Sequence, residues 1–125
     1  RFNHYDELSD QLRNGRLNDG NQVSNKQYKT AMKELFVLKN QVDDVFDEID
    51  IIITPSAPGE ALKGLDYTGS PIFNTTWSLN GNPCITLPLF TGHQALPIGC
   101  QLVTRFGNDD MLLDFSNEIY KAYLK

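Results

Sequence analysis

The spacing of apolar positions divides the chain into helical and strand-like stretches. The clearest helix begins after Ser24, because Ser24 and Gln27 have the spacing of a capping box, in which each side chain bonds the other residue's backbone N–H. We expect this helix to end near Glu48, and its apolar residues recur at steps of three and four: Tyr28, Met32, Leu35, Leu38, Val42, Val45, Phe46 and Ile49. That spacing predicts a helix that buries a broad apolar face.

A run of three isoleucines, residues 51–53, predicts a strand buried on both faces, although a buried helix segment shares this pattern. Pro55 has no backbone N–H and disfavours helix at Thr54, so the run should end there. Two further strands are expected at residues 84–89 and 98–103. The turn at residues 91–93 between them favours an antiparallel pair. A strand buried on both faces belongs inside a larger sheet than this chain can build alone.

Turn residues set the remaining boundaries. A weakly amphipathic helix is expected in residues 1–20, broken or ended at the turn dipeptides Asn14-Gly15 and Asp19-Gly20. Residues 55–71 are rich in proline and glycine and predict a loop, after which Pro71 would begin a helix of residues 71–79. Residues 80–83, Asn-Gly-Asn-Pro, would end that helix.

The last predicted helix is capped by Asn108 and carries an apolar stripe of Leu112, Phe115, Ile119 and Tyr123. Asp109 and Asp110 in its first turn suit the helix dipole. The order helix, strand, helix, strand, strand, helix makes the fold class α/β, with about three strands and covering helices. Residues 1–125 are interpreted as a single segment.

Composition and charge narrow the function classes. The 125 residues are 40% hydrophobic and 22% charged, as in ordinary globular proteins. The net charge of −5, with scattered Lys and Arg, argues against nucleic acid as a partner. No apolar run approaches the length of a membrane span, about 20 residues. The chain begins with Arg1 rather than Met, which we interpret as the sign of a processed product or a fragment.

Cys84 and Cys100 are too few for a disulfide scaffold and lie in apolar, strand-like surroundings. We expect free, buried thiols rather than a bridge, and therefore a reducing, cytoplasmic compartment.

No complete active site can be read from the residue pattern. A nucleophilic serine needs a base within reach and donors for an oxyanion, and no serine here lies in a Gly-x-Ser-x-Gly turn or a Gly- and Ser-rich loop. His4 and His93 are interpreted as solvated loop residues, and no metal site is expected. An acidic cluster is interpreted as a solvated helix face; its residues are Asp43, Asp44, Asp47, Glu48 and Asp50. Trp77, beside Phe73 and Asn74, either packs in the core or lines a pocket.

An ordered set of short motifs resembles the C-terminal part of amidase signature family enzymes. The motifs are Asp50-Ile-Ile-Ile-Thr-Pro55, Ala57-Pro-Gly-Glu-Ala61, Thr68-Gly69, Phe73-Asn74, Trp77, Gly81-Asn-Pro83, Leu87-Pro88 and Leu96-Pro-Ile-Gly-Cys-Gln-Leu-Val103. The resemblance covers nearly the whole chain. The Ala57–Ala61 stretch looks most like the simple amidases and less like the components of complexes that transamidate aminoacyl-tRNA.

The resemblance implies a portion of a mixed-sheet fold and a protein that hydrolyses carboxylic amides to an acid and ammonia or an amine. The family uses a Ser-Ser-Lys triad and no metal or cofactor, and its triad lies upstream of this region, so no catalytic residue is carried over. The matching helix implies that Phe73, Asn74 and Trp77 line the substrate cleft. The implied ligand is a small-molecule amide. Self-association through an exposed apolar face is also expected. The alternative is a non-catalytic binding or scaffold module derived from the same fold.

Overall fold

The computed structural model describes residues 4–123. The chain divides into two compact units, residues 1–37 and residues 38–125. Helix α2 (Asn25–Val45) contributes its beginning to the first unit and its end to the second.

The first unit is built from short helical segments. They are a 3-10 turn, η1 (Tyr5–Glu7), a π-helix, η2 (Leu12–Leu17), and α1 (Asn18–Gln22). The predicted interruption at Asn14-Gly15 is confirmed, because Gly15 has non-helical dihedrals (φ −96°, ψ −106°). The predicted interruption at Asp19-Gly20 is wrong. Gly20 lies inside α1, since glycine can adopt helical dihedrals where neighbouring turns support them.

The predicted capping box at the start of α2 is confirmed. Gln27 Oε1 accepts a hydrogen bond from the Ser24 N–H at 2.9 Å, and the Gln27 N–H donates to Ser24 Oγ at 3.3 Å. The prediction of a broad buried face is wrong, because α2 has no buried residue and Tyr28 is 59% exposed. The helix ends at Val45, and Phe46, in the turn that follows, is the buried residue of the predicted stripe.

The second unit contains an antiparallel sheet of three strands: β1 (Ile51–Pro55), β2 (Cys84–Thr91) and β3 (Pro97–Thr104). The order is β1-β3-β2, so β3 is central and pairs with both others, which confirms the predicted pairing of the last two strands. In this register Leu102 lies between Ile53 and Ile85. A bulge lies in β2 between Leu87 and Phe90, where Pro88 interrupts the hydrogen-bond ladder.

Strand β1 is an edge strand of this sheet, and the expectation of burial on both faces is wrong for Ile53, which is 62% exposed. Ile51 and Ile52 are half-buried. The physical reason is that α4 packs mainly on β2 and β3, which leaves the Ile53 side of β1 uncovered, and that β1 has a neighbouring strand on one side only among residues 4–123. Pro55 is tolerated as the last residue of β1 because an edge strand can lack a ladder donor.

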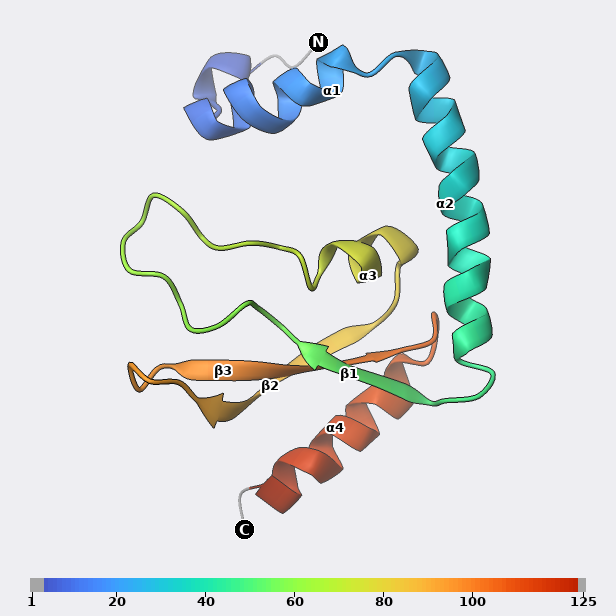
Figure 1. Ribbon diagram of the computed structural model, residues 1–125, viewed down its shortest axis with the longest axis vertical. Coiled ribbons are helices and arrows are strands. Elements are labelled where there is room, and N and C mark those ends of the chain that lie inside the picture. The colour runs from blue at the N-terminus through green and yellow to red at the C-terminus, as the bar shows by residue number, and fades with distance from the viewer. Residues whose placement is uncertain (1–3, 124–125) are drawn as a thin grey trace. The chain divides into compact units, whose positions relative to one another are not determined.

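Helix α4 (Asp109–Tyr123) covers one face of the sheet, and α3 (Thr75–Asn80) with the preceding loop lies over the other (Figure 1). The core under α4 is formed by Leu87, Leu102 and Leu112. The Leu112 N–H donates to the Asn108 carbonyl at 3.1 Å, as expected of a helix that follows Asn108. The predicted stripe is corrected at two of its four members, since Phe115 is 43% exposed and Tyr123 is 55% exposed. Ser116 lies buried on this helix.

Helix α3 is shorter than predicted. Pro71 begins a turn, in which the Pro71 carbonyl accepts hydrogen bonds from the N–H groups of Asn74 and Thr75. The α-helix itself starts at Thr75. Its predicted end is confirmed. Gly81 adopts the left-handed conformation (φ +80°), and its N–H donates to the Trp77 carbonyl at 2.8 Å, as glycine does at a helix C-terminus.

Candidate functional site

A cleft of about 790 Å³ lies between the loop after β1 and the start of β3. The loop supplies Ser56 to Lys63 and Thr68 to Pro71, and the other wall comes from Asn74, Gln94, Pro97 and Gly99. The prolines and glycines of residues 55–71 explain why this segment leaves the sheet as a loop rather than as another strand. The cleft is lined by small apolar residues such as Ala57 and Pro97 and by polar residues such as Asn74, a mixed lining that is usual for a small-molecule site.

A chain of side-chain hydrogen bonds joins the sheet to the wall of this cleft. Thr54 Oγ1 donates to Gln101 Oε1 at 3.0 Å, and Gln101 Nε2 donates to Asn74 Oδ1 at 2.7 Å. Asn74 Nδ2 in turn donates to the Ser56 carbonyl at 3.0 Å. Gln101 is only 4% exposed, so its amide depends on these partners rather than on water. These three hydrogen bonds therefore hold the Asn74 side chain in a defined orientation at the cleft.

Ser56 is held to β3 by its own backbone and side chain. Its N–H and its Oγ both donate to the Gly99 carbonyl, at 3.3 and 3.2 Å. Gly99 leaves room for this approach, because a Cβ there would come within 2.3 Å of Ser56 Oγ. The hydroxyl proton is thus bonded to a neutral carbonyl rather than to a general base, which gives Ser56 the geometry of a structural serine and not of an activated nucleophile.

Glu60 crosses from the loop to the turn between β2 and β3. Its Oε1 accepts hydrogen bonds from the N–H groups of Gln94 (2.8 Å) and Leu96 (3.1 Å). Its Oε2 lies 3.2 Å from the Gln94 nitrogen. Hydrogen bonds from N–H groups to a carboxylate are among the stronger ones in proteins. Glu60 therefore ties the two walls of the cleft together.

The structure brings one of the three predicted site residues to the cleft. Asn74 lines it, whereas Phe73 and Trp77 are half-buried and are not among its lining residues. The sequence analysis did not predict that Ser56, Glu60 and Gln101 form or support the cleft. A signal for Gln101 was present, because a polar residue within an apolar strand run must find a hydrogen-bond partner when it is buried. The partner of Glu60 is 34 residues away along the chain, and the sequence carries no local signal for it.

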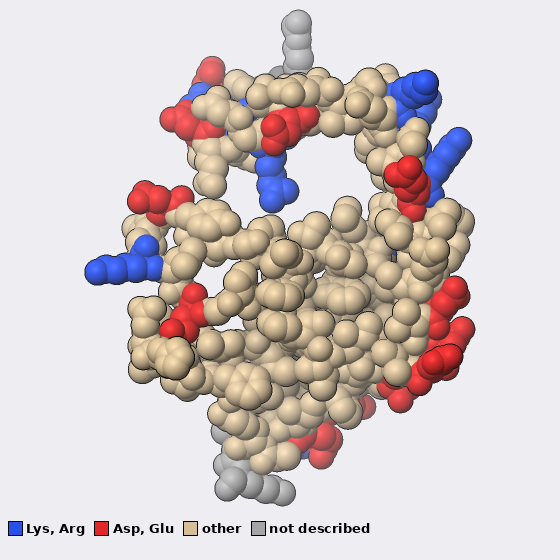
Figure 2. Space-filling model, viewed as in Figure 1, with Lys and Arg blue, Asp and Glu red and all other residues tan. Residues whose placement is uncertain are grey.

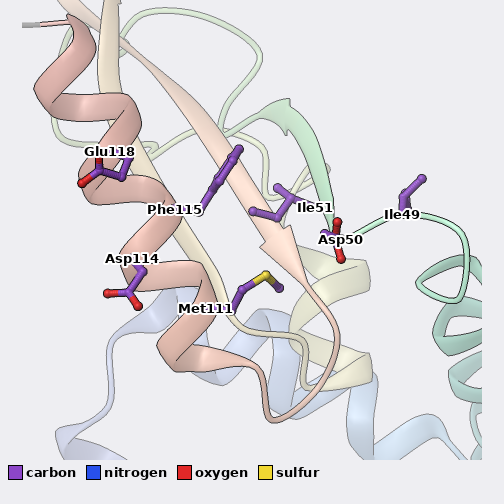
Figure 3. A pocket seen from close by; sticks show the side chains of 7 residues that line it. All are labelled: Ile49, Asp50, Ile51, Met111, Asp114, Phe115 and Glu118. Atoms are coloured by element: carbon purple, nitrogen blue, oxygen red, sulfur yellow. The ribbon is translucent and has the colours of Figure 1, made fainter.

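A second hollow, of about 870 Å³, lies between the start of β1 and α4 (Figure 3). Its floor is apolar, with Ile51, Met111 and Phe115. Figure 3 shows that the carboxylates of Asp114 and Glu118 point away from Ile51, so they do not converge on a shared point. Within residues 4–123 there is also no group of three His, Cys, Asp or Glu residues arranged to hold a metal ion.

The acidic cluster gathers at the C-terminal end of α2 (Figure 2). Its carboxylates are exposed, which confirms the interpretation as a solvated face. Two of them form salt bridges with the guanidinium group of Arg105. Arg105 Nη2 lies 2.5 Å from Asp47 Oδ1, and Arg105 Nε lies 3.3 Å from Asp43 Oδ1. The hydrogen bond with Asp47 raises the pKa of Arg105. This cluster fastens the end of α2 to the end of β3.

The two cysteines and the two histidines do not line either hollow described above. Cys84 and Cys100 are free, as predicted, but Cys84 is exposed and Cys100 half-buried, so the prediction of buried thiols is wrong for Cys84. The cause is position, because Cys84 begins the edge strand β2. His93 is exposed in the turn before β3, and His4 Nδ1 lies 2.8 Å from Glu7 Oε1 at the surface.

Comparison with known proteins gives a family. The family model described as Amidase matches residues 3–113. One component of the glutamyl-tRNA(Gln) amidotransferase from Helicobacter pylori (strain G27) is 32% identical over 71% of this chain and 21% of its own length. The corresponding protein of Wolinella succinogenes is 29% identical over 76% of this chain and 22% of its own length. The chain thus spans about a fifth of the length of these relatives.

Solved structures show the same fold. A crystal structure of an amidase superposes with a TM-score of 0.73, at 24% identity, over 85% of this chain and 27% of that one. A 6-aminohexanoate cyclic dimer hydrolase superposes with a TM-score of 0.68, at 23% identity, over 82% of this chain and 26% of that one. None of the helices in residues 4–123 combines the length and apolarity that crossing a membrane requires. With a family match that covers most of its length, this chain belongs to the Amidase family.

Proposed function

We propose that these 125 residues are the C-terminal segment of an amidase that hydrolyses carboxylic amides to an acid and ammonia or an amine. The segment contributes part of the sheet and a wall of the substrate cleft, and the Ser-Ser-Lys triad belongs to a part of the protein outside this sequence. The observation that carries the proposal is the family match over residues 3–113, together with a cleft whose wall presents the amide of Asn74. A carboxamide side chain can both donate to and accept from a substrate amide.

Phe73 and Trp77 keep their proposed role as substrate-binding residues beside Asn74. All three are half-buried and come from α3 or the turn before it. In this proposal Phe73 and Trp77 border the cleft once the rest of the amidase domain is present. Titrating the full-length protein with a substrate amide tests this role, since a ligand near Trp77 changes tryptophan fluorescence. An unchanged emission spectrum at saturating substrate would exclude Trp77 from the site.

The activity proposal is tested by comparing the isolated chain with the full-length protein. We expect the pure 125-residue chain to release no ammonia from simple aliphatic or aromatic amides, and the full-length protein to do so in a reaction that a serine-directed inhibitor stops. Inhibitor-sensitive hydrolysis by the isolated chain would contradict the proposal. A native polypeptide whose intact mass equals this chain would instead favour a non-catalytic binding or scaffold module.

A second candidate is suggested by the curated relatives, which are components of glutamyl-tRNA(Gln) amidotransferases. In this case the protein would act on an aminoacyl-tRNA within a complex, and the tRNA would be held by other members of the complex, since this chain carries a net charge of −5. Hydrolysis of simple amides by the purified single protein favours the first proposal. Amide chemistry that requires glutamyl-tRNA(Gln) and partner proteins favours the second.

Two further proposals concern the self-association of the chain and its location in the cell. Ile53 on the open edge of β1 and Leu38 on α2 are more than half exposed, so we propose that the isolated chain self-associates. Sedimentation over a range of concentrations tests this, and a monomer at every concentration would contradict it. A cytoplasmic location remains a proposal, which fractionation of the native source would test.

A further inference from the structure

The turn between β2 and β3 presents backbone N–H groups to a carboxylate. Ala95 has a positive φ (+61°), the left-handed conformation that non-glycine residues seldom adopt. The turn is closed by the Gly92 N–H, which donates to the Leu96 carbonyl at 2.9 Å, and by the Ala95 N–H, which donates to the Gly92 carbonyl at 3.1 Å. The N–H groups of Gln94 and Leu96 both donate to Glu60. Backbone N–H groups on either side of a residue in the left-handed conformation, directed to one acceptor in this way, form an anion-binding concavity.

The backbone at Gly92 is shaped to admit the Glu60 side chain. A Cβ at position 92 would come within 2.2 Å of Glu60 Cδ and 2.5 Å of Glu60 Oε1. Any side chain there would therefore displace the carboxylate from the turn. The close approach and the two bonded N–H groups are separate observations that indicate the same contact.

The loop that carries Glu60 has few other attachments. Ser56 is bonded to Gly99 at the beginning of the loop, and Pro71 accepts hydrogen bonds at its end. Between them, residues 61–70 make no hydrogen bond to the rest of the described chain. Leu65 is 99% exposed and Leu62 is 57% exposed, so apolar packing does not hold this stretch either. Glu60 is thus the main attachment of the loop to the opposite wall of the cleft.

We propose that Glu60 is a latch and a positioning residue. Its carboxylate occupies a backbone carboxylate receptor in the 92–96 turn and so holds the loop of residues 56–71 closed over the cleft. Because Glu60, Gln94 and Pro97 line the cleft, the width of its entrance depends on this contact. Release of Glu60 frees the loop without unfolding the sheet. The functional meaning of the latch, control of access for an amide, rests on the proposed function, whereas the latch itself does not.

Hydrogen exchange of single backbone amides, measured by NMR on the full-length protein, tests the latch without any assay of activity. In Glu60→Ala we expect the amides of Gln94 and Leu96 to exchange on the order of ten to a hundred times faster, since each loses a bond to a charged group. Glu60→Gln keeps a neutral acceptor oxygen and should give a smaller increase. Asp66→Asn is the matched control, because it removes a carboxylate from the same loop that no residue binds in the described structure.

The carboxylate receptor is tested by chemical rescue. In Glu60→Ala, added acetate should shift the Gln94 and Leu96 N–H signals in a saturable way, and sodium chloride at the same ionic strength should not. The native chain should show no such shift, because its tethered carboxylate has a high effective concentration at the turn. Unchanged exchange at both amides in Glu60→Ala would overturn the proposal. An increase that extends equally to Leu102 and Val103 would also overturn it, since Glu60 would then stabilise the whole unit rather than the loop.

Discussion

Gln101 Nε2 donates a hydrogen bond to Asn74 Oδ1 at 2.7 Å, which joins the centre of the sheet to the residue that lines the cleft. The two residues are 27 positions apart in the chain, and Gln101 is 4% exposed. Because alternate residues of a strand point to opposite faces, Gln101 faces α3 while Leu102 faces α4. One strand therefore supplies both the core and the support of the candidate site.

Asn74→Ala should lower the free energy of unfolding by about 1–3 kcal/mol, because it leaves the buried Gln101 amide without its acceptor. Urea unfolding followed by circular dichroism measures the change. The matched control is Asn117→Ala on the exposed surface of α4, where alanine should stabilise the helix by about half a kcal/mol. Equal effects of the two substitutions would show that the Gln101–Asn74 bond contributes nothing.

Gly92→Ala should open the latch from the other side. The new Cβ would occupy the place of the Glu60 carboxylate, so we expect faster exchange at Gln94 and Leu96, while Leu102 and Val103 stay protected. Gly59→Ala is the comparison, because a Cβ at Gly59 meets nothing within 4 Å. If Gly92→Ala leaves both turn amides protected, the side chain of Glu60 does not need the space that Gly92 provides.

Leu102→Ala should be the most damaging of these substitutions. Leu102 is fully buried between β1, β2 and α4, and truncating a leucine in such a core costs roughly 2–5 kcal/mol of stability. Leu65→Ala in the loop removes a side chain that is 99% exposed and should change stability by less than about 0.5 kcal/mol. Denaturant titration of both variants measures the difference, and a small loss at Leu102 would mean that the core forms elsewhere.

The thiol of Cys84 should react slowly at neutral pH although the residue is exposed. Partial desolvation raises the pKa of this thiol above the ordinary value, so little thiolate is present at pH 7. A raised thiol pKa contributes stability at low pH that is lost as the pH rises through the folded-state pKa. The rate of alkylation of Cys100→Ser against pH measures the folded-state value, and the same chain in urea gives the reference. An apparent pKa in the folded chain at or below the urea value would contradict the prediction.

Local patterns in the sequence determined much of the fold. The capping box at Ser24, the apolar runs that became β1, β2 and β3, and the glycine that ends α3 each depend on neighbouring residues. Local steric and hydrogen-bond preferences act over three or four positions, so the residues themselves carry these signals. The ordered motifs also identified the family that the comparisons confirm.

Only the tertiary structure decided which of these elements is buried and which residues meet. Periodicity marks an apolar face but does not supply the surface that covers it, so α2 and Ile53 are exposed although their pattern predicted burial. The contacts that build the cleft join Glu60 to Gln94 and Asn74 to Gln101, over 34 and 27 positions. Such contacts depend on how the strands pair and on where the loop crosses them. A local pattern spans only three or four positions, so it cannot predict a contact between residues that are 27 or 34 positions apart.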